Sequence, residues 1–532
     1  MSRSLDAGCP LSDWKDLRFR RTGSRYVTQV SNGEAARADF AATAGALLPV
    51  ANEGIAMKSL KSLRVLQTAA AVLALTCLAR SAIAEFEFGI PTPVPPPINI
   101  DGGFGYPTLA DDGLTMYFAA DPPYYGGPYS TGHFDIWKTT RASLSDPWGP
   151  YVNLGAPINT QQYTEIGPSF TADRHELFFM RSLSPFGLPE GDLFVSHQQT
   201  DGSYGDPVPL SELNSAGNEG YPSVSSDGLT LYFSTVGLTN PKYPNPTNGE
   251  WNTFVAHRPD RNSPFGDAEF FFGGYGHVSP DGLTHIIMGY PDFAEHYDVP
   301  NVGDADLYVR TRESVDDPWG PIQWLKPPVN SSGQLLDPPW TGVGLECCGT
   351  FSAADSMLYF TSVRPGSDPT GPVGFVDMWQ VPLAEAVPVD VKPGADPAPI
   401  NLKSNGVLPV AVLSTTDFDA TAVDAATLKF GDPLLIADGA TPADPLRWSY
   451  EDVNHDGLDD LSLKFSLQDL RATGVFTSST TEGYLAGQLQ DGSHIAGRDA
   501  VLVFSPGRTI PEPAGLVLMI AGLAALAAVR RR

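Results

Sequence analysis

Short runs of alternating apolar and polar residues, separated by Asp-Gly turns, follow one another through the middle of the chain. One phrase of this kind occurs five times, and each copy ends in an apolar or aromatic run. The copies span 107–118, 168–179, 222–233, 276–287 and a stretch, one residue shorter, that ends at Phe360. Two short alternating runs around an Asp-Gly turn predict a β-hairpin.

Two further phrases follow the hairpin, the first in all five repeats and the second in four of them. A third strand is predicted at Asp135–Trp137, Asp192–Phe194, Asn252–Phe254, Asp306–Tyr308 and Asp377–Trp379, at intervals of 54 to 71 residues. An aromatic-Gly turn and a loose fourth strand then follow at Trp148-Gly149, Tyr204-Gly205, Phe265-Gly266 and Trp319-Gly320. Four strands in such an interval indicate one blade of a β-propeller.

The fifth repeat lacks its own fourth strand, and the start of the mature chain supplies a matching piece. Phe88-Gly89 is followed by Pro97-Ile98-Asn99 with the spacing that Trp148-Gly149 and Trp319-Gly320 have to their own Pro-x-Asn segments. An outer strand contributed by the N-terminus would join the two ends of the ring and protect an exposed edge. We therefore predict an all-β chain with a five-bladed propeller over residues 85–387, closed between 85–99 and 377–383.

The repeated P-S-x-S-x-D-G-x-x-[LI]-[YF]-F phrase resembles the TolB-type, WD-repeat-like propellers of bacterial envelope and exported proteins. The resemblance covers about 300 residues and implies a fold, whereas function varies widely among propellers. Blade three departs from the pattern with Asn252 in place of Asp. Blade four departs with His277 and with Ile286-Ile287.

Inner strands line the centre of a propeller, so their variable positions are candidates for chemistry. The same register gives Glu165, Glu219 and Glu346, with Phe104 and Gly273 in the other two blades, and His277 lies nearby on its own strand. Such carboxylates can hold a cation or a sugar, or act as the acid and base of a glycosidase. A solvated acidic rim is the alternative. Strand-initial aspartates should instead bond turn amides, namely Asp135, Asp192, Asp306 and Asp377.

Cys347 and Cys348 are the cysteines of the predicted mature chain. Adjacent cysteines in an oxidising compartment either close a strained eight-membered disulfide ring or remain buried thiols. Both alternatives stay open at this point, and a metal site is disfavoured because no clustered His or Cys-x-x-Cys accompanies the pair.

From Pro388 the pattern changes to the alternating strands of a small β-sandwich over 388–505. The segment resembles an accessory domain of exported bacterial proteins that begins V-D-[IV]-K-P-G and carries a D-V-N-x-D-G loop. Here Asp452, Asn454, Asp456 and Asp460 supply side-chain oxygens, Leu458 a carbonyl and Gly457 the sharp turn that a Ca²⁺ loop requires. Position twelve is Leu463 rather than Glu, so a seventh ligand must come from elsewhere, with Glu451 as one possibility.

Both ends of the chain carry predicted targeting signals. Residues 57–84 have the basic start, apolar stretch and Ala82-Ile83-Ala84 ending of a secretory signal that is cleaved before Glu85. Residues 1–56 precede this start and are either a mis-assigned translation start or a long leader. Residues 506–532 resemble the PEP-CTERM sorting signal, with Pro511-Glu512-Pro513, an apolar segment at 514–529 and three arginines. That resemblance implies processing by an exosortase, and a simple membrane anchor is the alternative.

Composition narrows the function. A net charge of −28 disfavours nucleic acid as a ligand, because phosphate recognition needs a basic face. The chain contains no G-x-S-x-G, H-E-x-x-H, P-loop or dinucleotide fingerprint. We therefore expect a protein secreted to the surface of a Gram-negative bacterium, attached to the membrane only through 514–529, that binds a polysaccharide or a surface protein. A glycosidase that uses the propeller carboxylates is the alternative, since five-bladed propellers carry arabinanase-type enzymes.

Overall fold

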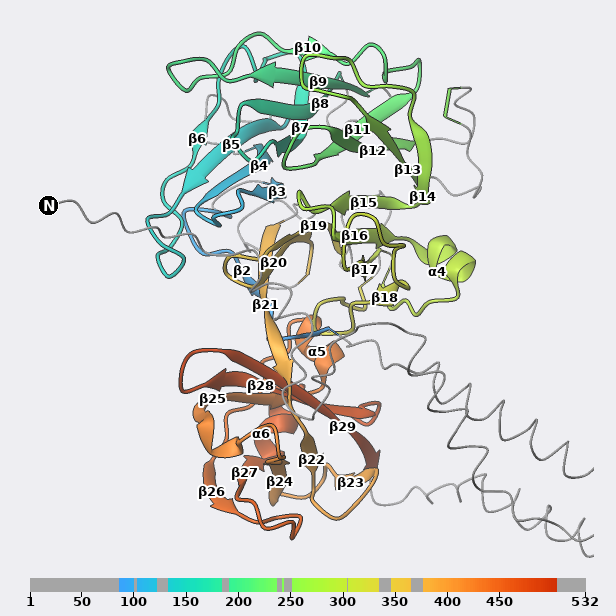
Figure 1. The fold of residues 1–532 in the computed structure, drawn as a ribbon. Helices are drawn as coiled ribbons and strands as arrows, with labels where there is room; N and C mark the ends of the chain where they lie inside the picture. The colour runs from blue at the N-terminus through green and yellow to red at the C-terminus, as the bar shows by residue number, and fades with distance from the viewer. Residues whose placement is uncertain are drawn as a thin grey trace, which may run out of the picture. The chain divides into compact units, whose positions relative to one another are not determined.

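The computed structural model describes most of the chain between Phe86 and Phe504 (Figure 1). The described ranges are 86–99, 103–121, 133–183, 191–236, 242–243, 251–303, 305–333, 346–364 and 377–504. The predicted signal peptide, the segment upstream of it and the sorting signal with its apolar stretch therefore lie outside the described residues. Within the described ranges, no helix is long and apolar enough to cross a membrane.

The chain is all-β and forms consecutive four-stranded antiparallel sheets, each made of neighbouring strands in sequence order. The first two sheets contain β3 (Gly103–Leu109), β4 (Thr115–Asp121), β5 (Asp135–Thr140) and β6 (Val152–Asn153), then β7 (Thr164–Phe170), β8 (Glu176–Ser182), β9 (Gly191–His197) and β10 (Val208–Pro209). The next two contain β11 (Asn218–Val224), β12 (Thr230–Val236), β13 (Trp251–His257) and β14 (Glu269–Gly273), then β15 (Tyr275–Val278), β16 (Thr284–Gly289), β17 (Asp306–Thr311) and β18 (Gln323–Trp324). One short helix, α4 (Pro291–Tyr297), interrupts the fourth repeat.

The fifth repeat consists of β19 (Glu346–Ser352), β20 (Met357–Ser362) and β21 (Asp377–Ala386), and the N-terminal segment completes it. The short strand β2 (Thr92–Pro93) pairs antiparallel with β21 at Gln380 and Trp379. Gly89 donates its N–H to the Pro382 carbonyl at 2.8 Å, as Gly149 does to Thr140 at 2.9 Å in the first repeat. The predicted pairing of the N-terminus with the last repeat is thus present.

A buried or half-buried Asn side chain ties the repeats in the same way at four places. Asn159 donates to the Ile136 carbonyl at 2.8 Å and accepts from the Ile136 N–H at 2.9 Å. Asn99 of the N-terminal segment makes the same two bonds with Met378, at 2.8 and 2.9 Å. The equivalent pairs in the second and fourth repeats are Asn214 with Leu193 and Asn330 with Leu307.

The hairpin turns form because Asp caps them. In the first, third and fourth repeats the turn Asp accepts the N–H of the residue two positions on, at 2.9 Å each, and the Gly between them has a left-handed φ of 66–77°. Asp and Gly are the residues that this conformation favours. The pattern that predicted the hairpins therefore has a direct structural cause.

The inner strands contact one another in the order β3, β7, β11, β15, β19 and back to β3. Four of them carry an irregularity of register, at which the chain turns left-handed: Tyr106, Gly167, Tyr221 and Cys348 have φ values of 53–62°. β15 has no such bulge, in the repeat that also departs from the sequence pattern.

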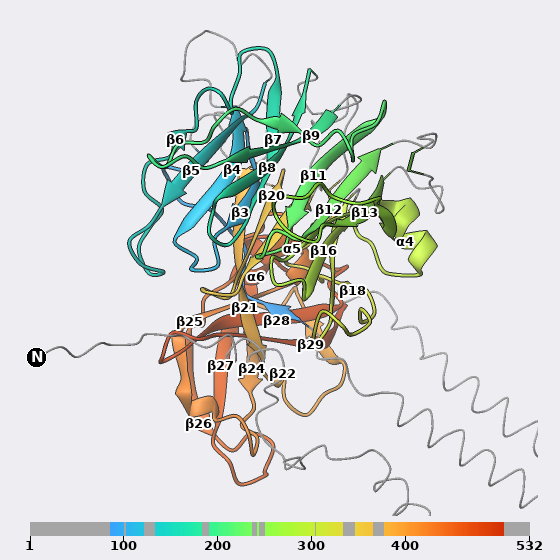
Figure 2. The same cartoon turned by 45° about the horizontal axis from the view of Figure 1, so that its top comes forward.

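Residues after Val387 form two sheets around one apolar core. One sheet has the order β22 (Val389–Val391), β24 (Val407–Val412), β27 (Asp460–Ser466) and β26 (Arg447–Glu451). The other contains β25 (Val423–Gly431), β28 (Glu482–Leu489) and β29 (His494–Phe504), with β23 (Ala398–Asn401) parallel to β29. Val410, Leu463, Phe430 and Tyr484 from both sheets belong to the core. The short helices α5 (Pro433–Ala437) and α6 (Leu467–Ala472) were not expected (Figure 2).

The strand β21 links the two regions. Its first half pairs with β20 and β2, and its second half pairs with β1 (Glu87–Phe88) and, in parallel, with β29. Arg498 of β29 bonds Glu87 at 3.0 Å, and the N–H of Ser332 donates to Asp438 at 2.8 Å. The described residues from Phe86 onward form one compact unit.

Candidate functional site

The three glutamates that the sequence singled out are fully buried, each with 0% of its surface exposed. Glu165 accepts hydrogen bonds from the hydroxyl and N–H of Thr160, at 3.0 and 3.2 Å. Glu219 accepts the same two bonds from Ser215, at 2.6 and 2.7 Å. Ser331 binds Glu346 in the same way, at 2.8 and 3.3 Å. Each carboxylate therefore holds the loop that precedes its own strand.

Two of these carboxylates also pair with an arginine. Arg181 Nε lies 2.9 Å from Glu165, and Arg364 Nη2 lies 3.0 Å from Glu346. Both arginines also donate to carbonyls of the Pro-x-Asn segment, Arg181 to Ile158 at 2.7 Å and Arg364 to Pro328 at 2.9 Å. The Glu–Arg pair thus anchors the same loop in two repeats.

The sequence left open whether these glutamates form a solvated acidic rim or a ligand site. A solvated acidic rim would leave the carboxylates exposed, and they are buried. Ser, Thr and Arg side chains donate to the carboxylate oxygens, so a ligand would have to displace these donors. Sequence reasoning missed these donors, and the recurring Asn-Ser or Asn-Thr pairs at 159–160, 214–215 and 330–331 are the signal that marks them.

Burial raises the pKa of Glu165 to about 7, although Arg181 and Thr160 lower it in part. In the unfolded chain the pKa of a glutamate carboxyl is about 4.3. Between this value and about 7, the folded state therefore holds a proton on Glu165 that the unfolded chain has lost. The stabilising contribution of this proton is complete below about pH 4 and is lost as the pH rises to about 7.

We therefore expect the free energy of unfolding to fall between about pH 5 and about pH 7. Glu165→Gln, which keeps the neutral form at every pH, should flatten that slope, as measured by urea titrations across the range. An unchanged slope in the variant would contradict the assignment.

His277 lies in β15 and is partly buried, and its buried Nε2 atom lacks a hydrogen-bond partner among the described residues. Burial lowers its pKa to about 4. In other repeats a Ser or Thr at this place bonds the next repeat, as Thr108 bonds the Pro168 carbonyl at 2.6 Å. His277 is therefore uncharged at neutral pH, and it occupies in the fourth repeat the place that Thr108 has in the first.

The centre of the inner strands is filled by aromatic rings and thiols. Tyr221 stacks on Tyr106 with ring centroids 5.4 Å apart and meets Tyr275 edge-on at 4.9 Å. Cys347 and Cys348 belong to the same buried cluster as free thiols, with their sulfurs 2.8 Å apart. Burial raises the pKa values of all three tyrosines.

The contact with Cys348 and burial raise the pKa of the Cys347 thiol. Since the thiolate is the reactive form, the native protein should react with iodoacetamide at least on the order of tenfold more slowly than the unfolded chain. Mass spectrometry of labelled native and denatured protein measures this. A loss of two mass units with no labelling in either state would indicate the disulfide instead.

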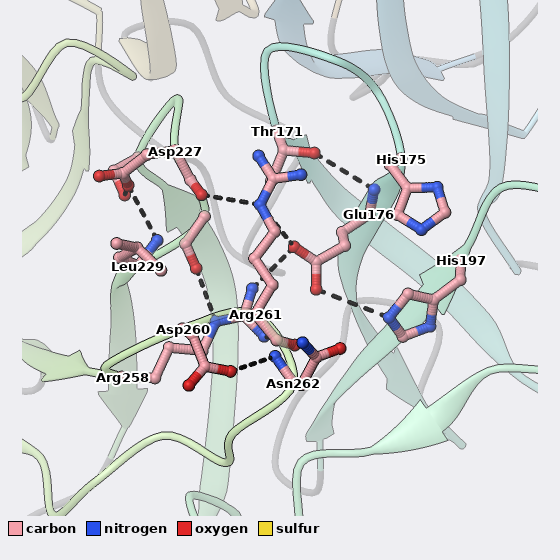
Figure 3. A network of polar contacts seen from close by, with 12 residues as sticks. Thr171, His175, Glu176, His197, Asp227, Leu229, Arg258, Asp260, Arg261 and Asn262 are labelled. Atoms are coloured by element: carbon pink, nitrogen blue, oxygen red, sulfur yellow. Dashed lines mark hydrogen bonds and ion pairs between the residues drawn. The ribbon is translucent and has the colours of Figure 1, made fainter.

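A polar network connects the second and third repeats on the side of the hairpin turns (Figure 3). The carboxylate of Glu176, at the start of β8, accepts from Arg258 at 2.7 Å and lies 3.6 Å from both His197 and Arg261. Arg261 also pairs with Asp173 of the neighbouring turn at 2.6 Å. The network joins two turns and thereby ties two repeats together.

Arg258 makes a pair of contacts that recurs in the first and fourth repeats. Its Nε donates to the Gly228 carbonyl of its own turn, as Arg141 does to Gly113 and Arg312 to Gly282, at 2.7–2.8 Å. Each guanidinium also stacks on the aromatic ring of the following aromatic-Gly pair at 4.4–4.6 Å, namely Trp148, Phe265 and Trp319. These charged residues hold turns in place.

The strand-initial aspartates have mixed partners. Asp306 accepts turn N–H groups from Val302 and Gly303, at 2.9 and 3.2 Å, as predicted. Asp135 accepts instead from the side-chain amide of Asn153 at 2.6 Å.

In the predicted calcium loop, three of the proposed ligands lie together on the surface. Asp452 accepts the Asp456 N–H at 3.0 Å, and the Asn454 amide donates to Asp456 at 2.9 Å. Asp460 is buried and accepts N–H groups from Ser414 and Val453, at 2.8 and 2.9 Å. Among the described residues, no group of three or more His, Cys, Asp or Glu side chains is arranged to hold a metal. Calcium binding remains a prediction.

If the loop binds Ca²⁺ only in the folded state, the ion should stabilise the protein by about 2.7 kcal/mol at a hundredfold excess over Kd. Millimolar Ca²⁺ should then raise the melting temperature of the full chain and a chelator should lower it, whereas Asp456→Ala should abolish the response. Melting that is indifferent to both additions would identify the loop as an acidic turn.

No protein-family model matches this chain, and no curated protein sequence matches it. Among solved structures, it is similar to the catalytic domain of a GH62 alpha-L-arabinofuranosidase from Coprinopsis cinerea, at 10% identity and a TM-score of 0.33, over 56% of this chain and 96% of that chain. A putative TolB from Agrobacterium tumefaciens is 14% identical with a TM-score of 0.27, over 43% of this chain and 68% of that chain. A family 117 glycoside hydrolase of Zobellia galactanivorans is 11% identical with a TM-score of 0.35, over 56% of this chain and 89% of that chain. At these values the likeness concerns the arrangement of strands alone.

Proposed function

We propose that this chain is an exported surface protein that binds its ligand without chemical turnover, with residues 85–387 as a five-bladed propeller and 388–505 as a β-sandwich. The propeller closes because the N-terminal segment repeats, on β21, the Gly and Asn contacts that join the other repeats. The terminal sequences support the proposed export to the cell surface. They also support processing by an exosortase and attachment to the membrane through 514–529.

One observation carries the absence of turnover. The inner-strand carboxylates that a glycosidase would use are buried, and donors of their own repeats bond them: Glu165 is held by Thr160 and Arg181, and Glu346 by Ser331 and Arg364. A general acid must reach the leaving oxygen of its substrate within hydrogen-bond distance. Ligand binding then falls to the faces of the propeller and the sandwich, with a polysaccharide or surface protein as the expected class.

Glycoside hydrolysis is the second candidate, and the Glu165 carboxyl is the observation that favours it. A pKa of about 7 leaves this group partly protonated at neutral pH, which suits a general acid. The substrate would have to displace the bonds from Thr160 and Arg181.

One experiment separates the two. The full chain is incubated with a panel of bacterial and plant polysaccharides, and both retention in affinity electrophoresis and the release of reducing ends are measured. We expect retention by at least one polymer, or by none if the ligand is a protein, without release of sugar. Release that Glu165→Gln abolishes would establish the hydrolase.

A further inference from the structure

The strand β26 is an exposed edge with no partner on its outer side among the described residues. It closes the sheet β22-β24-β27-β26 and pairs only with β27. All five of its residues are exposed, and it lies at the margin of this region in both views (Figures 1 and 2). An edge of this kind presents unpaired N–H and C=O groups that another strand can bond.

The sequence of β26 is complementary to itself in the antiparallel direction. When Ser449 faces Ser449 of a second copy, Arg447 faces Glu451 and Trp448 faces Tyr450, in both directions. Opposite charges and aromatic pairs directly across an antiparallel ladder are stabilising. The same register satisfies the two-fold symmetry that a closed dimer requires.

Within its own chain, β26 has unfavourable charge neighbours. On β27, Arg447 lies opposite Lys464 and Glu451 lies opposite Asp460. Like charges directly opposite each other are destabilising. On β27, therefore, neither Arg447 nor Glu451 faces a residue of opposite charge. A second copy of β26, paired along the free edge, would supply one for each of them.

The other face of β26 is apolar and incompletely covered. Trp448 and Tyr450 lie opposite the buried Leu463 and Leu461, yet 46% and 45% of their own surfaces are exposed. Leu446, just before the strand, is 57% exposed. In the antiparallel pair the aromatic rings of the two copies would meet and continue the apolar layers of both cores.

We propose that two copies of this chain associate through β26, antiparallel and centred on Ser449. The acidic loops 452–460 then lie at opposite ends of the paired strands, so they do not repel each other across the interface. A five-residue strand pair is a small interface, and we expect a weak, concentration-dependent dimer.

Charge exchange tests the register in the full chain, by sedimentation velocity from about 5 to about 200 µM, a range chosen for a weak interface. Arg447→Glu places two acidic pairs across the interface and Glu451→Arg two basic pairs, so each variant should weaken the dimer about tenfold. The double variant R447E/E451R should restore it. A mixture of the two single variants should associate more tightly than either variant alone, because each mixed pair again places opposite charges across the interface.

Glu313→Arg, on an exposed turn far along the chain from β26, makes the same change of charge and should leave association unchanged. All substituted positions are exposed, and the exchanges at 447 and 451 replace a like-charge pair with β27 by an opposite one, so no variant should melt below the wild type. If the wild-type chain sediments as a monomer at every concentration, the proposal is overturned, because the edge of β26 then binds no second copy. A dimer that neither Arg447→Glu nor Glu451→Arg weakens would also overturn it, by assigning association to another surface.

Discussion

Glu346→Ala should lower the free energy of unfolding by about 3–5 kcal/mol. The substitution removes the carboxylate that pairs with Arg364, whose side chain is 2% exposed, and it also removes the acceptor of Ser331 and Ser362. Removing one partner of a buried ion pair costs far more than the pair itself contributed. Urea unfolding of the full chain at pH 7 measures the loss.

Two variants make this result specific. Glu346→Gln keeps an acceptor for the serines and should lose less, and Glu346→Leu combined with Arg364→Met should lose less than the sum of the single changes. Glu313→Ala, at an exposed position, should change stability by no more than about 0.5 kcal/mol. A loss below about 1 kcal/mol for Glu346→Ala would mean that the carboxylate is not a structural anchor.

Deletion of residues 85–99 should have the other large effect. It removes β1 and β2 and three buried side chains, Phe88, Val94 and Ile98, which are 0–5% exposed. Each such side chain contributes about 1.5–3 kcal/mol through burial, so the total loss is on the order of 5 kcal/mol. That is comparable to the whole stability of a domain, and the freed edge of β21 should promote aggregation.

A pair of point variants separates closure from simple truncation. Asn99→Ala removes the two bonds to Met378, and Asn159→Ala removes the two equivalent bonds to Ile136. If the N-terminal segment has the same role as the internal segments, both should cost a similar amount, about 1–3 kcal/mol. A neutral Asn99→Ala beside a costly Asn159→Ala would contradict closure, as would an unchanged melting temperature for the deletion.

The strands and their order could be predicted from the sequence because local chemistry determines them. Asp112, Asp227 and Asp281 cap the turns, and the period of two in the flanking runs sets the faces. The spacing from Phe88-Gly89 to Asn99 predicted the pairing with β21 for the same reason.

The surroundings of the candidate residues could not be predicted in this way. Glu346 is bonded by Ser331, fifteen positions earlier, and by Arg364, eighteen positions later. A charged residue is usually exposed, so composition and register alone favour a solvated rim over a buried anchor. Only the fold shows that partners distant in sequence neutralise the charge. The short helices α5 and α6 escaped notice because one or two turns give no readable period.

A cross-link tests ring closure most directly. Thr92 and Gln380 face each other in the pairing of β2 with β21, and directly opposite residues in an antiparallel ladder lie within disulfide range. In the variant T92C/Q380C, mild oxidation should form an intramolecular disulfide between these positions, detected by peptide mapping, and should raise the melting temperature. The control T92C/K138C, which joins β2 to a strand of the first repeat, should not form one. A failure of the first pair to cross-link in the folded protein, or equal cross-linking of both pairs, would contradict the closed ring.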